Sequence, residues 1–316
     1  MATNETKGKL FKEFCPITTL DELNSTLEKY GIAVLPNVFT EQECEALKRK
    51  VFFHLKKTFN VVEPDDYVKL RPMLGYMMKS FGISFLPEIL EMKTDERVVN
   101  AFRAIWNEQD LTTSFDAIAI VPPPEKRSNP VYFDETKTWF HTDQSSDKKG
   151  MHCVQSFINL DETGEGDGCL SVLVDSHRYH AEFFERFNES SRGTDWFRLD
   201  QRAHLDWYMR EKKCEWAMIQ APKGSMVFWD SRLIHMGTAP RQGRPNPDRW
   251  RFIAYVCYTP ARLQSNSDKE FKKMAYANQF HTSHWPYGLT RDDDNFECDE
   301  SIEGLSPRQK KLFGID

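Results

Sequence analysis

Two apolar runs joined by a glycine-rich turn stand out at residues 151–174, which read MHCVQSFINLDETGEGDGCLSVLV. Short apolar runs that are bounded by Gly and Asp are typical of β-strands. Similar runs occur at 115–121 (FDAIAIV), 225–230 (SMVFWD) and 252–258 (FIAYVCY). Several such strands after N-terminal helices predict a mostly β fold, with a core of two sheets under a helical cover.

Helices are predicted on either side of these strands. Residues 40–57 read TEQECEALKRKVFFHLKK, and Thr40 and Glu43 have the spacing of a capping box. An apolar stripe at helical spacing predicts a second helix at 94–106. The charged and aromatic stretch 181–216 interrupts the strands, and we interpret it as a helical insertion. Active-site lids are a common reason for such long excursions between core strands.

No internal repeat or linker divides the sequence, so we expect a single domain over residues 1–316. Its core is expected at about 28–262, followed by a C-terminal extension at 263–316. The seven cysteines are odd in number and include no CxxC pair, which disfavours a disulfide framework and favours a reducing compartment. We find no secretory signal, peroxisomal C-terminal address or transmembrane run, and therefore expect a cytoplasmic protein.

The charge balance disfavours one class of partner. The net charge is -6, from 48 acidic and 42 basic residues. Nucleic-acid binding needs clustered Lys and Arg to neutralise phosphates, so we expect no nucleic-acid partner. We also expect no membrane partner. A small-molecule substrate is expected instead, and the oligomeric state is not predicted by the sequence.

A possible metal site begins at His141 and Asp143. Residues two apart on a strand point to the same side, so this imidazole and carboxylate could bind one ion. The best candidate for a third ligand is His235, which follows the strand-like run at 225–230. Two histidines and one carboxylate leave octahedral positions open, as iron(II) oxygenases require. The alternative interpretation of a lone His-x-Asp pattern is a surface pair, or a histidine satisfied inside the core.

Several segments support the metal interpretation because of the order in which they occur. They are GIAVLPNVFTEQECEAL at 31–47, HTD at 141–143, GDGCLSVLVDSH at 166–177, GSMVFWDSRLIH at 224–235 and RFIAYVCYTPA at 251–261. Taken in this order, they resemble the phytanoyl-CoA dioxygenase family of iron(II)/2-oxoglutarate oxygenases. The resemblance covers roughly residues 28–262.

The resemblance implies a double-stranded β-helix, which is a cupin-like jelly roll. It implies that His141, Asp143 and His235 bind iron(II), with 2-oxoglutarate and dioxygen as cosubstrates. The family uses an arginine on a late strand to hold the distal carboxylate of 2-oxoglutarate, since a guanidinium binds a carboxylate through two parallel hydrogen bonds. Arg251 matches that position. Arg249 is the alternative, because it would face the same side if the strand began earlier.

Other cofactor-binding residues also follow from the resemblance. Phe157 matches an aromatic position near the cosubstrate, and Gln155, on the same side of the strand, would line the same pocket. The alternative for Phe157 is ordinary core packing. The family often has Gly-Ser after the distal histidine, where this sequence has Met-Gly-Thr, so the hydroxyl contact is expected to be lost or to come from Thr238. Asp175 replaces the usual glycine before Ser-His.

The remaining polar candidates have weaker support. His177 and His180 are less favoured as ligands, and we expect a structural role for His177. His281 and His284 have a spacing that could suit a metal on a helix, but no carboxylate pair is near them in the sequence. Gln144 could reach a substrate, and Arg232 could pair with a substrate carboxylate or with a structural acid. The insertion, which contains Arg192, Trp196 and Arg198, could act as a lid.

The expected function is an iron(II)- and 2-oxoglutarate-dependent dioxygenase that hydroxylates a small metabolite. The carboxylate at Asp143 favours oxygenation, because related halogenases have a small residue there to admit chloride. Desaturation, ring formation and demethylation remain alternative outcomes for the same type of enzyme. A catalytically silent β-helix that binds or senses a ligand is an alternative of a different class.

Overall fold

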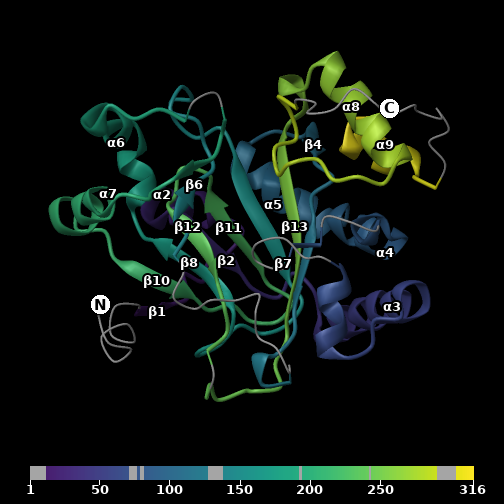
Figure 1. Ribbon diagram of the computed structural model, residues 1–316. Helices are drawn as coiled ribbons and strands as arrows, with labels where there is room; N and C mark the ends of the chain where they lie inside the picture. The colour runs from purple at the N-terminus through teal and green to yellow at the C-terminus, as the bar shows by residue number, and fades with distance from the viewer. Residues whose placement is uncertain are drawn as a thin grey trace.

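Two β-sheets pack face to face in the computed structural model, which describes residues 12–70, 77–78, 82–126, 138–191, 194–241, 243–289 and 304–316 (Figure 1). Sheet A has the strand order β1 (Lys12–Phe14), β10 (Trp216–Ile219), β8 (Cys169–Leu173), β12 (His235–Thr238), β6 (His141–Thr142) and β9 (Phe197–Arg198). Sheet B has the order β2 (Ile32–Leu35), β11 (Met226–Asp230), β7 (Val154–Asn159), β13 (Arg251–Pro260), β5 (Ile118–Val121) and β3 (Met77–Met78). The predicted two-sheet core is confirmed.

The space between the sheets is an apolar interior. It is built from alternate residues of each strand, because successive side chains point to opposite faces of a sheet. Leu170 and Val172 of sheet A pack there with Phe157, Trp229 and Ile253 of sheet B. Any polar residue in register with these side chains is therefore held inside the molecule.

The outer face of sheet B is covered by α2 (Leu23–Tyr30), α3 (Glu41–Phe59), α4 (Pro87–Lys93) and α5 (Glu96–Trp106). The predicted capping box at the start of α3 is present: Thr40 Oγ1 accepts from Glu43 N at 3.2 Å, and Glu43 Oε2 accepts from Thr40 N at 2.7 Å. The second predicted helix begins at Glu96 instead of residue 94, because the Asp95 side chain caps it by accepting from Arg97 N. Helices hold more residues than strands in the described part of the chain, so the helical cover is larger than a mostly β fold would suggest.

The stretch 181–216 covers the outer face of sheet A. It contains α6 (His180–Phe187), β9, α7 (Arg202–Asp206) and a π-helical turn (Trp207–Glu211), so it also adds a strand that the sequence did not predict. Its aromatic residues pack on outward-facing side chains of sheet A, namely Leu173, Trp216 and Met236. Arg192 lies outside the described residues.

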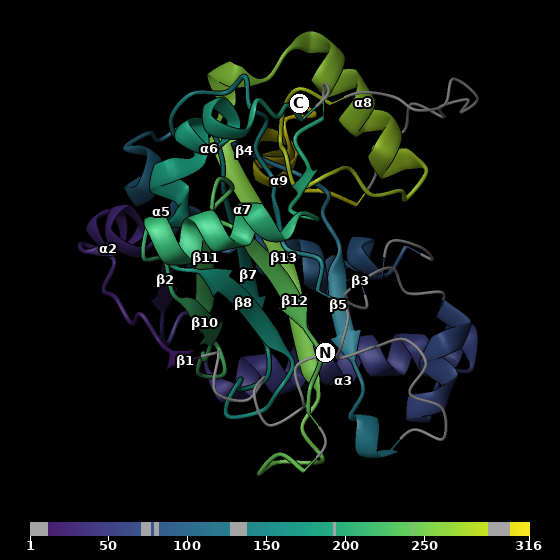
Figure 2. The same ribbon diagram turned by 60° about the vertical axis from the view of Figure 1, so that its left-hand side comes forward.

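The C-terminal part lies at one end of the sheets. Strand β4 (Leu111–Thr113) pairs with β13, and α9 (Pro307–Phe313) packs against β4, with α8 (Asn266–Ala277) nearby (Figure 2). Within the described residues, no helix has the length and apolar character needed to cross a lipid bilayer.

Candidate metal centre

Strand register brings the predicted metal ligands together. His141 on β6 pairs directly with His235 on β12. Asp143 follows β6, and its backbone N–H donates to Ser231 O at 2.9 Å, which fixes the chain there. The ligand atoms of His141, Asp143 and His235 all lie within 4.8 Å of one another. His141 and His235 are each 4% exposed and Asp143 is 8% exposed, so the cluster is not a surface pair.

Each imidazole is oriented by a backbone carbonyl. His141 Nδ1 donates to Trp139 O at 3.0 Å, and His235 Nδ1 donates to Leu233 O at 2.9 Å. A proton on Nδ1 leaves the lone pair on Nε2, which is the atom that faces the carboxylate. The Nε2 atoms of His141 and His235 lie 3.6 Å and 3.3 Å from Asp143 Oδ2. All three donors therefore point at one common position.

Gln155 holds the carboxylate of the cluster. Its Nε2 donates to Asp143 Oδ2 at 2.9 Å and lies 3.4 Å from Ser231 Oγ. The partner that a buried amide requires is thus Asp143. Gln155 was predicted to line the cosubstrate pocket, and the structure places its amide on the carboxylate of the candidate metal site. Partners of this kind fix the orientation of a ligand and raise metal affinity.

The electrostatics suit a cation. Burial acts to raise the pKa of Asp143, but His141 and His235 outweigh it and, with a smaller contribution from His284, hold that pKa well below its usual value. Burial lowers the pKa of His235, and the charge of His141 adds to that shift. An ionised carboxylate and a neutral imidazole are the protonation states that metal binding needs.

Aromatic rings surround the cluster. Trp139 stacks on His141 with ring centroids 4.7 Å apart, and the Trp229 ring lies 5.6 Å from His235. Trp196, from the segment before β9, is 48% exposed, and the centre of its ring lies 6.0 Å from the centre of the His141 ring. The insertion therefore reaches the edge of the cluster. Among the described residues, Trp229 Nε1 is buried and has no hydrogen-bond partner.

Arg251 lies inside the sheet pair, whereas Arg249 does not. Arg251 is 7% exposed, and its guanidinium carbon lies 5.5 Å from the centre of the Phe157 ring. Burial raises the pKa of Tyr255, and the neighbouring Arg251 opposes that shift. No carboxylate forms an ion pair with Arg251 in the part of the chain that the structure describes. Arg249 is bound by Asp167, whose Oδ2 accepts from Arg249 Nη1 at 2.7 Å.

Thr238 lies apart from the other predicted cofactor-binding residues. Residues three apart on a strand face opposite sides, and His235 faces the interior. Thr238 Oγ1 instead lies 2.6 Å from Ser171 Oγ, on the outer face of sheet A. Phe157, which is 3% exposed, lies in the apolar interior, a place that suits both a position near the cosubstrate and ordinary core packing. Asp175 adopts the left-handed conformation that glycine favours, with φ of 69°.

Three further candidates have protein partners. Gln144 is buried in its own loop, where its amide nitrogen donates to Gly150 O at 2.8 Å. His180 Nε2 donates to Gln144 O at 2.9 Å, and His177 Nε2 donates to Glu28 O at 3.0 Å. Both imidazoles therefore bind backbone carbonyl groups.

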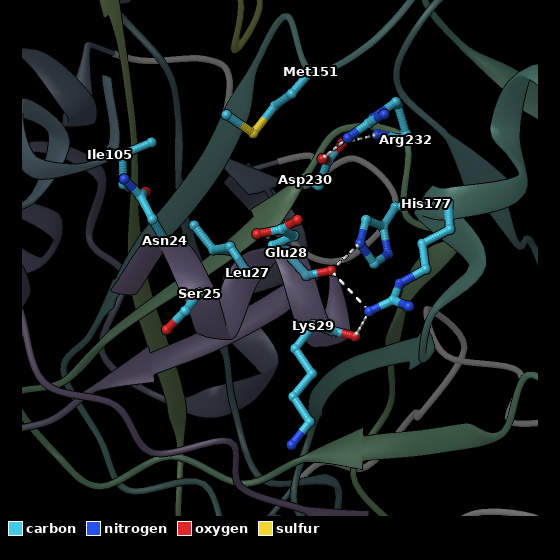
Figure 3. A pocket seen from close by; sticks show the side chains of 11 residues that line it. Asn24, Ser25, Leu27, Glu28, Lys29, Ile105, Met151, His177, Asp230 and Arg232 are labelled. Carbon is cyan, nitrogen blue, oxygen red and sulfur yellow. Dashed lines mark hydrogen bonds and ion pairs between the residues drawn. The ribbon is translucent and has the colours of Figure 1, made fainter. Parts of the chain in front are cut away.

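Arg232 is bound by an acid of the protein. Its Nε and Nη2 donate to the Asp230 carboxylate at 3.0 and 2.6 Å, on the wall of a pocket of about 690 Å³ beside α2 (Figure 3). Ser231, between them in the chain, accepts from Asp143 N and Thr142 Oγ1 instead. In this turn, Asp230 and Arg232 therefore line the pocket, whereas Ser231 contacts the segment that carries Asp143.

These features define a class of protein: a double-stranded β-helix whose interior presents two histidines and one carboxylate to a single position. The family model described as phytanoyl-CoA dioxygenase (PhyH) matches residues 27–244, which is more than half of the chain. The chain belongs to the phytanoyl-CoA dioxygenase family.

Two curated relatives are similar over much of the chain. Ava biosynthesis cluster protein O of Aspergillus versicolor is 27% identical over 214 residues, which cover 66% of this chain and 65% of that protein. A putative phytanoyl-CoA dioxygenase of Dictyostelium discoideum is 21% identical over 255 residues, which cover 69% of this chain and 70% of that protein. The match thus spans about two thirds of the length of each relative.

Solved structures share the fold. EctD from S. alaskensis, crystallised with 2-oxoglutarate and 5-hydroxyectoine, superposes with a TM-score of 0.53 at 14% identity and covers 80% of each chain. SnoK, a non-heme α-ketoglutarate-dependent carbocyclase from nogalamycin biosynthesis, superposes with a TM-score of 0.51 at 17% identity, over 77% of this chain and 87% of that one. At these identities the likeness shows the shared architecture.

Proposed function

We propose that this chain is an iron(II)- and 2-oxoglutarate-dependent dioxygenase that hydroxylates a small molecule. The observation that carries the proposal is the buried set of His141, Asp143 and His235, whose ligand atoms lie within 4.8 Å of one another. Two neutral nitrogen donors and one carboxylate form the facial set that non-heme iron(II) oxygenases use, and this set leaves positions open for reactants. Family membership supports a dioxygenase-type oxidoreductase.

The residues around the cluster fit 2-oxoglutarate as well as iron. Arg251 is a buried cation with no carboxylate partner in the described ranges, and a buried charge is costly unless it is paired. The distal carboxylate of 2-oxoglutarate would supply that partner. The indole N–H of Trp229, which also lacks a partner among the described residues, offers a further donor to an acidic ligand.

Each side chain would then have a defined task. His141, Asp143 and His235 would bind iron, and Gln155 would keep one oxygen of Asp143 in place through its hydrogen bond of 2.9 Å. Arg251 would orient the cosubstrate, while the rings of Trp139, Phe157 and Trp229 would keep water from the site. Bound iron(II) would supply the redox chemistry that couples the oxidative decarboxylation of 2-oxoglutarate to oxidation of the substrate by dioxygen.

The test begins with binding and ends with turnover. Purified chain is loaded anaerobically with iron(II), and 2-oxoglutarate is added while the visible charge-transfer absorption of the chelate is recorded. Succinate release is then screened over metabolite pools in air, with the Asp143→Ala variant as the control. We expect the absorption band and pool-dependent succinate release in the native chain only. A native chain that binds iron and 2-oxoglutarate but never releases succinate would instead be a binding or sensor protein.

Product mass separates the possible outcomes once a substrate is known. A gain of one oxygen atom is the expected result for hydroxylation. A loss of two hydrogens would indicate desaturation or ring closure on the same scaffold.

A further inference from the structure

The C-terminal segment 281–287 returns to the sheet pair after α8. Its first attachment is at Thr282, whose backbone N–H donates to Phe115 O at 3.2 Å, while Thr282 Oγ1 accepts from Phe115 N at 3.0 Å. Phe115 precedes β5 of sheet B. The segment is irregular, so the helical spacing considered for His281 and His284 does not apply.

The second attachment is at Trp285, which is 4% exposed. Its ring packs with Cys153 and Cys257, and Lys148 Nζ lies 3.7 Å from its centre. Cys257 on β13 pairs in register with Gln155, the residue that holds Asp143. The attachment at Trp285 therefore lies directly beside the strands that support the metal cluster.

His284 lies between these two attachments. Its Nε2 is enclosed and has no hydrogen-bond partner among the described residues. The centre of its ring lies 5.7 Å from the centre of the Trp285 ring, which itself packs against Cys153 and Cys257 beside the strands of the cluster. His284 is not a member of the ligand set whose atoms lie within 4.8 Å of one another. His284 thus lies next to the cluster without belonging to it.

The insertion and the C-terminal segment meet across Lys148. The Lys148 ammonium forms an ion pair with Asp195 at 2.7 Å and also covers the Trp285 ring. Asp195 additionally accepts from Ser145 N at 2.9 Å and directly precedes Trp196, whose ring faces His141. Three separate segments are therefore held around one edge of the metal cluster.

We propose that His284 is a substrate-binding residue, whose Nε2 forms a hydrogen bond with a hydroxyl, carbonyl or carboxylate group of a substrate held beside the metal. The proposal rests on the proposed function of the site. An enclosed imidazole nitrogen without a partner is unfavourable, so a polar ligand that supplies one gains a directional contact. The substrate class is then a small molecule with a polar group near the oxidised carbon, in contrast to an unsubstituted alkyl chain.

The test uses His284→Ala and His284→Gln, with His54→Ala as the control. His54 is a partly buried histidine on α3, where it packs against Phe59. We expect both His284 variants to keep iron and 2-oxoglutarate affinity within about 2-fold of the native chain, since Nε2 of His284 is not a ligand. Succinate release without added metabolites should also be unchanged. The increase in release caused by an active metabolite pool should fall at least 10-fold in His284→Ala, with a higher KM, and recover in part in His284→Gln.

Anaerobic equilibrium dialysis gives a second measurement that does not depend on turnover. The iron- and 2-oxoglutarate-loaded chain is dialysed against the same pool, and retained compounds are identified by mass spectrometry. We expect the native chain and His54→Ala to retain a polar compound that His284→Ala does not. Equal retention by both chains, or loss of iron from His284→Ala, would overturn the proposal. A native chain that binds the two cofactors but retains no pool compound also contradicts it, whereas a native chain that binds neither cofactor contradicts the proposed function itself.

Discussion

The two-sheet core and the segments attached to it contribute to the metal centre in different ways. The core positions the ligands through backbone register, since the pairing of His141 with His235 fixes the backbone from which both imidazoles extend. The insertion approaches the same cluster through the Trp196 ring, and the C-terminal segment lies beside its strands with Trp285 and His284. Backbone ladders fix the position of a residue through many repeated bonds, whereas a side-chain contact depends on one local arrangement.

A substitution should therefore have a severe effect in the core and a selective effect in the attached segments. Replacing a core residue at the cluster should affect metal or cosubstrate binding. Replacing a residue of the attached segments should alter substrate binding or local stability and leave the metal in place. Each of the following predictions tests one side of this division.

The largest effect is expected from the ligands themselves. His141→Ala or His235→Ala should lower iron affinity by more than roughly 100-fold, because loss of a ligand should exceed the cost of losing a supporting partner. Metal titration of the anaerobic apo chain measures this. Thr238→Val is the matched control on the same strand, since its hydroxyl contacts Ser171 on the outer face. Stoichiometric iron in either alanine variant would remove the basis of the proposed site.

Arg251→Ala is expected to have a large effect that is limited to 2-oxoglutarate binding. It should weaken 2-oxoglutarate binding by roughly 10- to 100-fold, the value of one or two hydrogen bonds between charged groups. Iron affinity should be unchanged. Arg249→Ala is the control because Arg249 is bound to Asp167. If Arg249→Ala weakened 2-oxoglutarate binding and Arg251→Ala did not, the cosubstrate would be held by the other arginine.

An intermediate effect is expected from Gln155→Ala. Loss of its hydrogen bond to Asp143 Oδ2 should free the carboxylate to rotate, and iron affinity should fall by roughly 10-fold. Gln155→Asn, with the same amide on a shorter chain, tests whether reach matters. A fall in 2-oxoglutarate affinity with unchanged iron affinity would support the original prediction that Gln155 lines the cosubstrate pocket.

The core of the fold could be predicted from sequence because it follows from periodicity, whereas the complete ligand set also rested on the family resemblance. Alternation along a strand identifies which residues share a side, so the spacing of His141 and Asp143 already implied convergence. The same rule, applied to β12, would have placed Thr238 on the opposite side from His235. Alternation therefore favours the other possibility that the family pattern left open, namely that the hydroxyl contact is lost.

Residues whose roles depend on distant partners could not be predicted in this way. Gln144 follows a metal ligand in sequence, yet its amide is used within its own loop. The location of His284 depends on attachments at Phe115 and Trp285, which are far apart in sequence. No local pattern encodes such contacts. One useful indication of such a contact was present in the sequence: Gln155 is a polar residue in a buried strand, so it needed a hydrogen-bond partner. The structure identifies that partner as Asp143.

The smallest effect concerns His180, which joins the insertion to the residue after Asp143. Burial lowers the pKa of His180 from 6.5 to about 4, and its Nε2 donates to Gln144 O. The unfolded chain therefore takes up this proton at a higher pH than the folded chain, so stability is lost as the pH falls below the unfolded pKa. From this residue we expect the free energy of unfolding to fall by about 1 kcal/mol between about pH 7 and pH 5.5.

Urea unfolding of the metal-free chain at several pH values measures this dependence. His180→Gln keeps a donor for Gln144 O but does not titrate, so its stability should change less over the same pH range. Iron affinity at neutral pH should be the same in both chains, since the ligands belong to the core strands and not to the insertion. A variant with the native pH dependence would place the titrating group elsewhere. A variant that lost iron at neutral pH would show that the insertion, through Gln144, also holds Asp143 in position.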